Sequence, residues 1–194
     1  MGQKEEKTQQ DSIPTWRKAV EKIEDGPLFR LAYCTRVYCS ERYPMAKADW
    51  AYVTNDGDIY LNPQRKASVG EWEYIISHCL LHLGFGHFQK ERMKDIRWNM
   101  ACDLVITRFL KDSHIGTPPP EFQQELPFSV KEEEQTFLQL QTASVSGSFF
   151  STMTGGRPDM MWNRDDIKTD YTEIFAQSLQ ASMQKTLMLS LIHI

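Results

Sequence analysis

The sequence has few of the features that mark membrane, secreted or nucleic-acid-binding proteins. No stretch approaches the roughly 18 uninterrupted apolar residues that a membrane span requires. The start, residues 1–12, is polar and charged and does not resemble a secretory signal. The 194 residues include 22 Lys and Arg against 26 Asp and Glu, which gives a formal charge of −4 and no basic cluster. We therefore expect no membrane association and no nucleic-acid partner.

Cysteine is also scarce, and its spacing excludes one common kind of zinc site. The four cysteines, Cys34, Cys39, Cys79 and Cys102, form no Cys-x-x-Cys pair, so a four-cysteine zinc knuckle is not expected. Without an export signal, we expect reduced thiols and a cytoplasmic protein. A free thiol packs as a small apolar residue, which is how we interpret Cys34, Cys39 and Cys102.

The composition, with 41% hydrophobic and 25% charged residues, is typical of a globular protein with a core. Alternating residues around Asn55-Asp56-Gly57 predict a β-hairpin over 50–61. Ser68 and Glu71 match a capping box and predict a helix to about Leu83. Further helices are predicted from Pro14 to the break at Gly26-Pro27, and over 28–37, 96–110, 131–141 and 165–185. The expected fold class is α+β, with a small sheet that contains the hairpin packed on one helix and the remainder helical.

The chain is expected to have five parts. Residues 1–12 are a disordered leader, 13–141 form the main domain, and the Ser-, Thr- and Gly-rich stretch 142–158 is a linker. Residues 159–188 are interpreted as the start of a truncated C-terminal region. The last six residues, 189–194, resemble a translated transposon-end adapter from sequencing libraries, which implies a fragment whose C-terminal domain is missing. An apolar helix end is the alternative interpretation of these six residues.

A pair of histidines on the predicted helix that begins at Ser68 suggests a metal site. His78 and His82 are four residues apart, so their rings project from one face about one turn apart. Two imidazole nitrogens in this arrangement can bind one metal at about 2.0–2.1 Å. Such a pair is common without a metal, and a helical domain with no metal is the alternative. The capped helix and the further candidate ligands nearby favour the metal.

The third ligand is predicted to be Asp103. The helix over 96–110 is apolar nearly all round, so it is expected to be buried, and a buried carboxylate is costly unless it is paired or bound to metal. Asn99, one turn earlier, can orient that carboxylate by a hydrogen bond. His87 is the rival third ligand, because glycines at 84 and 86 can turn the chain back toward the helix. A capping role or a salt bridge is the alternative for Asp103.

These residues together resemble a known family. The segment from His78 to His87, followed by the segment from Trp98 to Asp103, resembles the bacterial and phage metallopeptidase-like domain that precedes a von Willebrand A-like domain. That family shows HExxH, then GH, then WNxAxD, and Asn62-Pro63 after the hairpin fits its upstream stretch. The resemblance covers about residues 28–130. It implies a zincin-like fold, bound Zn²⁺, and a peptide or protein as substrate or partner.

Position 79 departs from the family pattern, because Cys79 stands where the family has glutamate. In HExxH enzymes that carboxylate takes a proton from the metal-bound water and passes it to the leaving amine. A thiol, with a reference pKa of about 8.5, is a poor substitute. We therefore expect a zinc-binding metallopeptidase-like domain with impaired hydrolysis, in which Cys79→Glu restores some activity.

Two alternatives to this function stay open. One is a non-catalytic binding module that the metal stabilises. The other follows from a weaker resemblance of the stretch from Leu81 to His87 to the bacterial ribosomal-RNA maturation metalloproteins, which also lack the glutamate. That resemblance implies a metal-dependent, ribonuclease-like hydrolase, although the last histidine lies one residue closer here than in those proteins.

Overall fold

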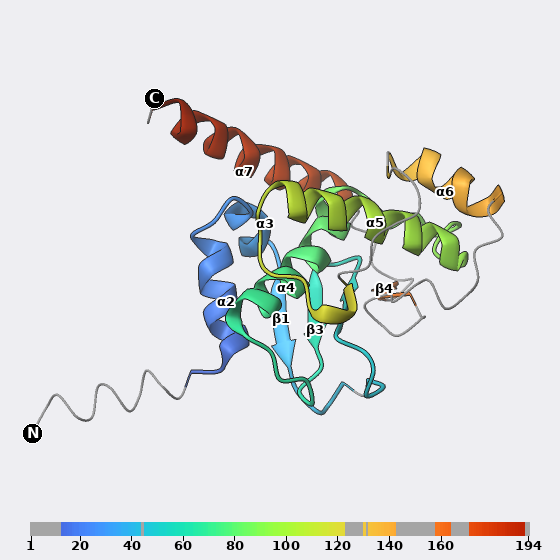
Figure 1. Ribbon diagram of the computed structural model, residues 1–194, viewed down its shortest axis with the longest axis horizontal. Coiled ribbons are helices and arrows are strands. Elements are labelled where there is room, and N and C mark those ends of the chain that lie inside the picture. Colours follow the sequence, from blue (N-terminus) through green and yellow to red (C-terminus); the bar gives the residue numbers. More distant parts are fainter. Residues whose placement is uncertain are drawn as a thin grey trace, which may run out of the picture.

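The protein has a mixed α+β fold, as predicted, built from one small sheet and a set of helices (Figure 1). The computed structural model describes residues 13–43, 45–122, 130, 132–142, 158–163 and 171–192, with the backbone alone for 186–192. The expected leader and residues 143–157 of the expected linker lie outside these ranges. The elements are α2 (Thr15–Glu24), α3 (Phe29–Tyr33), β1 (Arg36–Cys39), β2 (Ala51–Thr54), β3 (Asp58–Leu61), α4 (Val69–Gly84), α5 (Ile96–Asp112), η1 (Pro120–Phe122), α6 (Glu133–Thr142), β4 (Met160–Met161) and α7 (Thr172–Ile192).

The predicted hairpin forms the centre of the sheet. Strands β2 and β3 pair antiparallel, with Val53 opposite Ile59. The turn between them ends at Gly57, whose φ of 88° is a left-handed conformation that glycine adopts without strain. Strand β1 pairs parallel with β3, and β4 pairs parallel with β2, which gives the order β1-β3-β2-β4.

The predicted helix over 28–37 is wrong in its second half. Helix α3 ends at Tyr33, and the chain enters strand β1 at Arg36. The backbone N–H of Arg36 donates to the carbonyl of Gly57 at 2.9 Å, and Val37 lies beside Ile59 in the parallel ladder. A short apolar run suits a helix or a strand equally well, so pairing with a strand distant in sequence decides the outcome.

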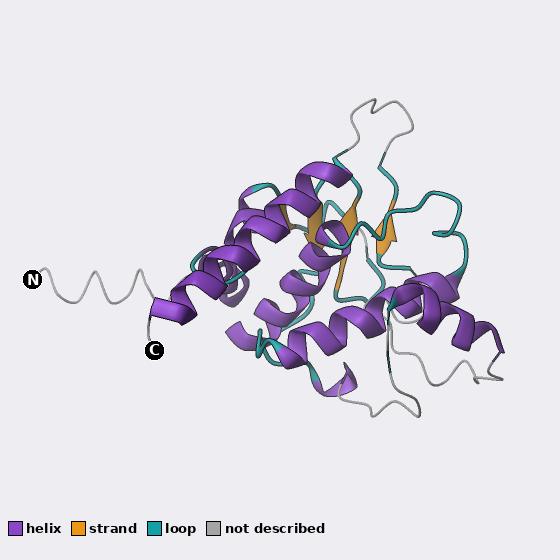
Figure 2. Cartoon of the chain, turned by 90° about the horizontal axis from the view of Figure 1, so that it is seen from above, coloured by secondary structure: helices purple, strands orange, loops and turns teal. Residues whose placement is uncertain are grey.

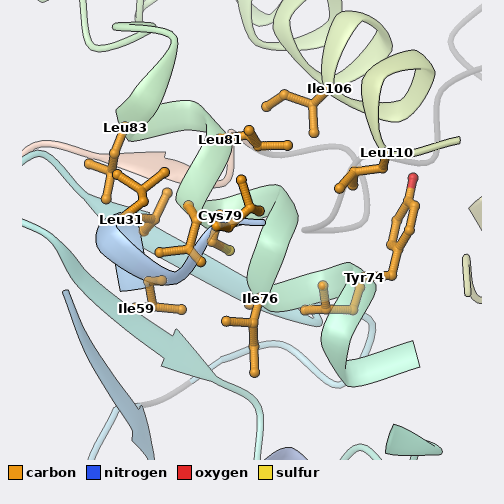
Figure 3. Close-up of a cluster of buried hydrophobic side chains, with 14 of the residues drawn as sticks. Leu31, Ile59, Tyr74, Ile76, Cys79, Leu81, Leu83, Ile106 and Leu110 are labelled. Atoms are coloured by element: carbon orange, nitrogen blue, oxygen red, sulfur yellow. The ribbon is translucent and has the colours of Figure 1, made fainter. Parts of the chain in front are cut away.

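Helix α4 runs through the centre of the molecule (Figure 1). The predicted capping box starts it: Ser68 Oγ accepts from the N–H of Glu71 at 3.2 Å, and Glu71 Oε2 accepts from the N–H of Ser68 at 2.8 Å. Every residue from Trp72 to Gly84 is buried, because α2, α5, α7 and β2 all pack against this helix. Figure 3 shows part of the apolar cluster that surrounds it.

The two faces of the sheet have different surroundings. Figure 2 shows the helices largely on one side of the strands, and Val53, Ile59 and Leu61 are buried in the core. The alternate residues Tyr38, Tyr60 and Tyr52 are half-buried and stack on one another across three strands, with ring centroids 5.3 and 4.8 Å apart. One face of the sheet therefore belongs to the core, and the other carries a row of stacked tyrosines.

The stretch 159–188, expected to begin a further region, adds a strand and a helix to the same core. Strand β4 extends the sheet beside β2, and α7 packs on α3 and α4. Phe175 and Leu179 of α7 are 2% and 7% exposed and belong to the central apolar cluster. No helix in the part of the chain that the structure describes is long and apolar enough to cross a membrane.

Candidate metal centre

Helix α4 places two histidine rings side by side in the interior, as the four-residue spacing predicts. Nε2 of His78 and Nε2 of His82 are 3.0 Å apart. The two residues are only 3% and 0% exposed, so neither ring can satisfy its polar atoms with bulk water. Both Nε2 atoms point to one common position.

Helix α5 brings Asp103 to the same position. Its Oδ1 lies 3.5 Å from Nε2 of His78 and 3.2 Å from Nε2 of His82. Its other oxygen, Oδ2, accepts a hydrogen bond from Nδ2 of Asn99 at 3.0 Å. The structure thus gathers the two histidines and the aspartate that the sequence singled out, and Asn99 lies where it can orient the carboxylate.

A fourth residue, Asp159, was missed by the sequence analysis. Its Oδ2 lies 3.4 Å from Nε2 of His78 and 3.5 Å from Nε2 of His82. Asp159 comes directly before β4, and its carbonyl accepts from the N–H of Val53 at 2.8 Å. The only local signal was a carboxylate followed by the apolar stretch 160–162, within a region interpreted as separate. Pairing of β4 with β2 is what carries this side chain into the centre.

Five of the six separations among the four residues match those of a tetrahedral metal site. One ligand atom from each lies within 4.8 Å of every other, and the five separations that involve a histidine run from 3.0 to 3.5 Å. Ligands about 2.0–2.1 Å from a metal at tetrahedral angles stand about 3.3 Å from one another. His78, His82, Asp103 and Asp159 therefore form a cluster that can bind a metal ion.

Hydrogen bonds do not satisfy this cluster. Both carboxylate oxygens of Asp159 and Oδ1 of Asp103 are buried, and apart from the two histidine rings of the cluster no described group donates a hydrogen bond to them. The facing Nε2 atoms of the two histidines allow at most one N–H between them. A buried carboxylate without a partner costs several kcal/mol. A cation bound at the common position gives all four atoms a partner at once.

The electrostatics of the cluster also favour a central positive charge. Burial opposes ionisation of Asp159, but the neighbouring rings of His82 and His78 hold the pKa of that carboxyl well below its usual range. Burial lowers the pKa of His82, while the carboxylates of Asp159 and Asp103 raise it, with a net value of about 9. The Asp159 carboxylate beside two histidine rings therefore favours a positive charge at the common position, whether a proton on a ring or a metal.

His87, the rival third ligand, lies beside the cluster and is not one of its four members. Its Nδ1 is 3.1 Å from Nδ1 of His82, on the side of that ring away from the centre. Its Nε2 is 3.2 Å from Oε1 of Glu133 in α6. Burial, the largest influence, lowers the pKa of His87 to about 4, even though Glu133 raises it.

Cys79 lies one residue after the first histidine but turns into the apolar core. It is completely buried among residues that include Leu31, Ile59 and Leu83, as Figure 3 shows. Burial raises the pKa of this thiol well above its usual value, and the charges of Asp159 and Asp103 raise it further. The thiol therefore stays protonated and cannot act as a base toward the centre.

All four cysteines are free thiols, and none contributes to the group of candidate ligands. Within the ranges that the structure describes, no second cluster of histidine, cysteine and carboxylate residues of this kind occurs. No family model, curated protein or solved structure matches this chain.

Proposed function

We propose that this chain is a zinc-binding, metallopeptidase-like domain in which the metal stabilises the fold and hydrolysis is impaired. The observation that carries the proposal is the fourth candidate ligand, the carboxylate of Asp159. Catalytic zinc sites keep one position for water, whereas structural sites have four protein ligands. Here four protein side chains surround one buried position, and the five separations that involve a histidine suit tetrahedral coordination, which supports a closed site without bound water.

The donor atoms favour zinc over other common cations. Two imidazole nitrogens and two carboxylate oxygens suit Zn²⁺ at tetrahedral spacing, whereas Mg²⁺ and Ca²⁺ take six or more oxygen ligands. Two neutral histidines, two carboxylates and one divalent cation carry no net charge, and a neutral site is the kind that a protein interior tolerates.

The position of Cys79 supports the loss of hydrolysis independently of the ligand count. A hydrolase of the HExxH kind needs a carboxylate next to the metal-bound water, and the residue at that sequence position points into apolar surroundings. The long helix with its two histidines, beside a sheet that contains a hairpin, supports the zincin-like resemblance. A ribonuclease-like hydrolase would also need water on the metal, so the closed ligand set weighs against it.

Metal content tests the proposal directly. Protein purified without chelator should contain about one zinc per chain by elemental analysis, because four ligands form a closed site. His78→Ala and His82→Ala should each abolish it, since each removes a ligand from the centre. His114→Asn is the matched control, because His114 is exposed and has a φ of 54° that asparagine also tolerates.

Wild-type protein that has been stripped of zinc with chelator is the reference for folding of the metal-free state, and the same protein refilled with zinc is the reference for the metal-bound state. Its circular dichroism shows whether a variant without zinc has lost only the metal or also its helices. Stoichiometric zinc retained in both His78→Ala and His82→Ala would refute the proposed site.

A further inference from the structure

A chain of side chains leads from the candidate metal centre toward the surface. His82 presents Nε2 to the cluster, and its Nδ1 contacts Nδ1 of His87 at 3.1 Å. Nε2 of His87 then contacts Oε1 of Glu133 at 3.2 Å. The two rings and the carboxylate form one continuous path that ends at a side chain 27% exposed.

The backbone holds His87 in place for this contact. After α4 ends, Gly86 adopts a φ of 71°, which reverses the chain. The N–H of His87 then donates to the carbonyl of His82 at 3.1 Å. The indole N–H of Trp98 donates to the carbonyl of His87, also at 3.1 Å. His87 is therefore fixed on both sides, and its ring is almost completely buried.

Only one arrangement of protons satisfies every atom along the path. A zinc-bound Nε2 of His82 is bare, so that ring carries its proton on Nδ1. This N–H can donate to His87 only if Nδ1 of His87 is bare, which places the proton of the neutral His87 ring on Nε2. That second N–H donates to the Glu133 carboxylate. A doubly protonated His87 would instead set two N–H groups against each other at 3.1 Å.

We infer that His87 and Glu133 are positioning residues that hold the His82 ring in its metal-binding orientation, and that His87 is not a ligand. The inference rests on the proposed zinc site. Partners of this kind fix the tautomer and orientation of a ligating histidine, and their loss typically costs 10–100-fold in metal affinity. Nδ1 of His78, by contrast, is buried without a hydrogen-bond partner among the described residues.

The same path connects α6 to the metal centre. Glu133 lies in the first turn of α6, and this helix otherwise packs mainly on α5, where Leu140 meets Met100 and Ala101. Binding of the metal to His82 therefore favours the position of α6 through two hydrogen bonds, without any ligand from α6 itself.

The ligands and the tautomers can be observed in the wild-type protein. Protein loaded with ¹¹³Cd and labelled with ¹⁵N should show cadmium–nitrogen coupling to Nε2 of His78 and His82 and none to His87. Long-range proton–nitrogen spectra should place protons on Nδ1 of His82 and Nε2 of His87. Cadmium coupling to a His87 nitrogen would overturn the inference. Absence of coupling to any histidine would overturn the proposed metal site itself.

Two substitutions at position 87 separate positioning from packing. His87→Leu removes the acceptor for the N–H of His82 and should weaken zinc binding about 10–100-fold in competition with a chelator. His87→Asn keeps a side-chain oxygen near the position of Nδ1 and should remain within a few-fold of wild type. Glu133→Leu should give an intermediate loss, because it removes only the second hydrogen bond.

Melting temperatures of the metal-free proteins provide the control for folding. Metal-free His87→Leu and His87→Asn should melt close to each other, so that any difference in zinc affinity comes from the hydrogen bond to His82. Equal zinc affinity in wild type, His87→Leu and His87→Asn would show that His87 does not position the ligand.

Discussion

The side chain at position 79 faces the apolar core and not the four candidate ligands. Cys79 lies on helix α4 and is fully buried against the apolar residues that pack on this helix. An uncharged thiol therefore fits where a carboxylate would not. The sequence-based expectation that Cys79→Glu restores some activity rested on adding back the missing carboxylate next to the ligands, although helical spacing already places Cys79 on the apolar face of the helix. The structure therefore changes the expected result of that substitution.

We expect Cys79→Glu to destabilise the protein without restoring hydrolysis. A polar group buried without a partner costs about 1–3 kcal/mol in proteins, and an ionised carboxylate costs more. Urea denaturation should show a loss of at least about that size relative to Cys79→Ala. A mixed peptide library should show no chelator-sensitive cleavage by either wild type or variant. A Cys79→Glu protein as stable as Cys79→Ala would contradict the buried position of this side chain. Chelator-sensitive peptide cleavage by that variant would contradict the proposed closed site.

Three of the four candidate ligands could be predicted from the sequence because helices α4 and α5 have strong local signals. The capping box fixes where α4 begins, and a four-residue spacing then places His78 and His82 on one face. Asp103 was predicted because it is a carboxylate in an otherwise apolar helix. Asp159 could not be predicted in this way, because a short parallel strand pairing, and no local pattern, brings it to the centre.

The capping box fixes where α4, the helix that carries His78 and His82, begins. Ser68→Ala removes the acceptor for the N–H of Glu71 and should lower the free energy of unfolding by about 1 kcal/mol. Glu71→Gln is the matched control, because glutamine can keep the reciprocal bond to the N–H of Ser68. Denaturation of the three proteins measures the difference. A larger loss in Glu71→Gln than in Ser68→Ala would assign the stabilisation to the charge near the helix terminus.

The sheet shows which elements a sequence can and cannot predict. The hairpin of β2 and β3 was predicted, because the turn around Gly57 and the alternating flanks lie within a few residues of one another. Strands β1 and β4 were not, since each pairs parallel with a strand that is distant in sequence. In both strands the segment is too short for its own pattern to decide between helix, strand and loop.

At the scale of the whole molecule, the proposed metal joins parts that are far apart in the sequence. The four candidate ligands come from α4, from α5 and from the residue before β4. The hydrogen bond from the N–H of Val53 to the carbonyl of Asp159 lies at the point where that last segment meets the sheet. Removal of the metal leaves two buried carboxylates without their cation, so the contact between β4 and β2 is expected to weaken first.

Removal of zinc should therefore lower stability globally and loosen β4 locally. With free zinc at 100 times its dissociation constant, the metal contributes about 2.7 kcal/mol, which corresponds to roughly 5–11 °C in melting temperature for a protein of this size. Amide hydrogen exchange supplies the local measurement, because chelator should speed exchange at Val53, which donates to the carbonyl of Asp159. The N–H of Asn62 donates to the carbonyl of Trp50 at the other end of the hairpin and serves as the control. If chelator speeds exchange at Val53 and Asn62 equally, the metal stabilises the domain as a whole and does not hold β4 in particular.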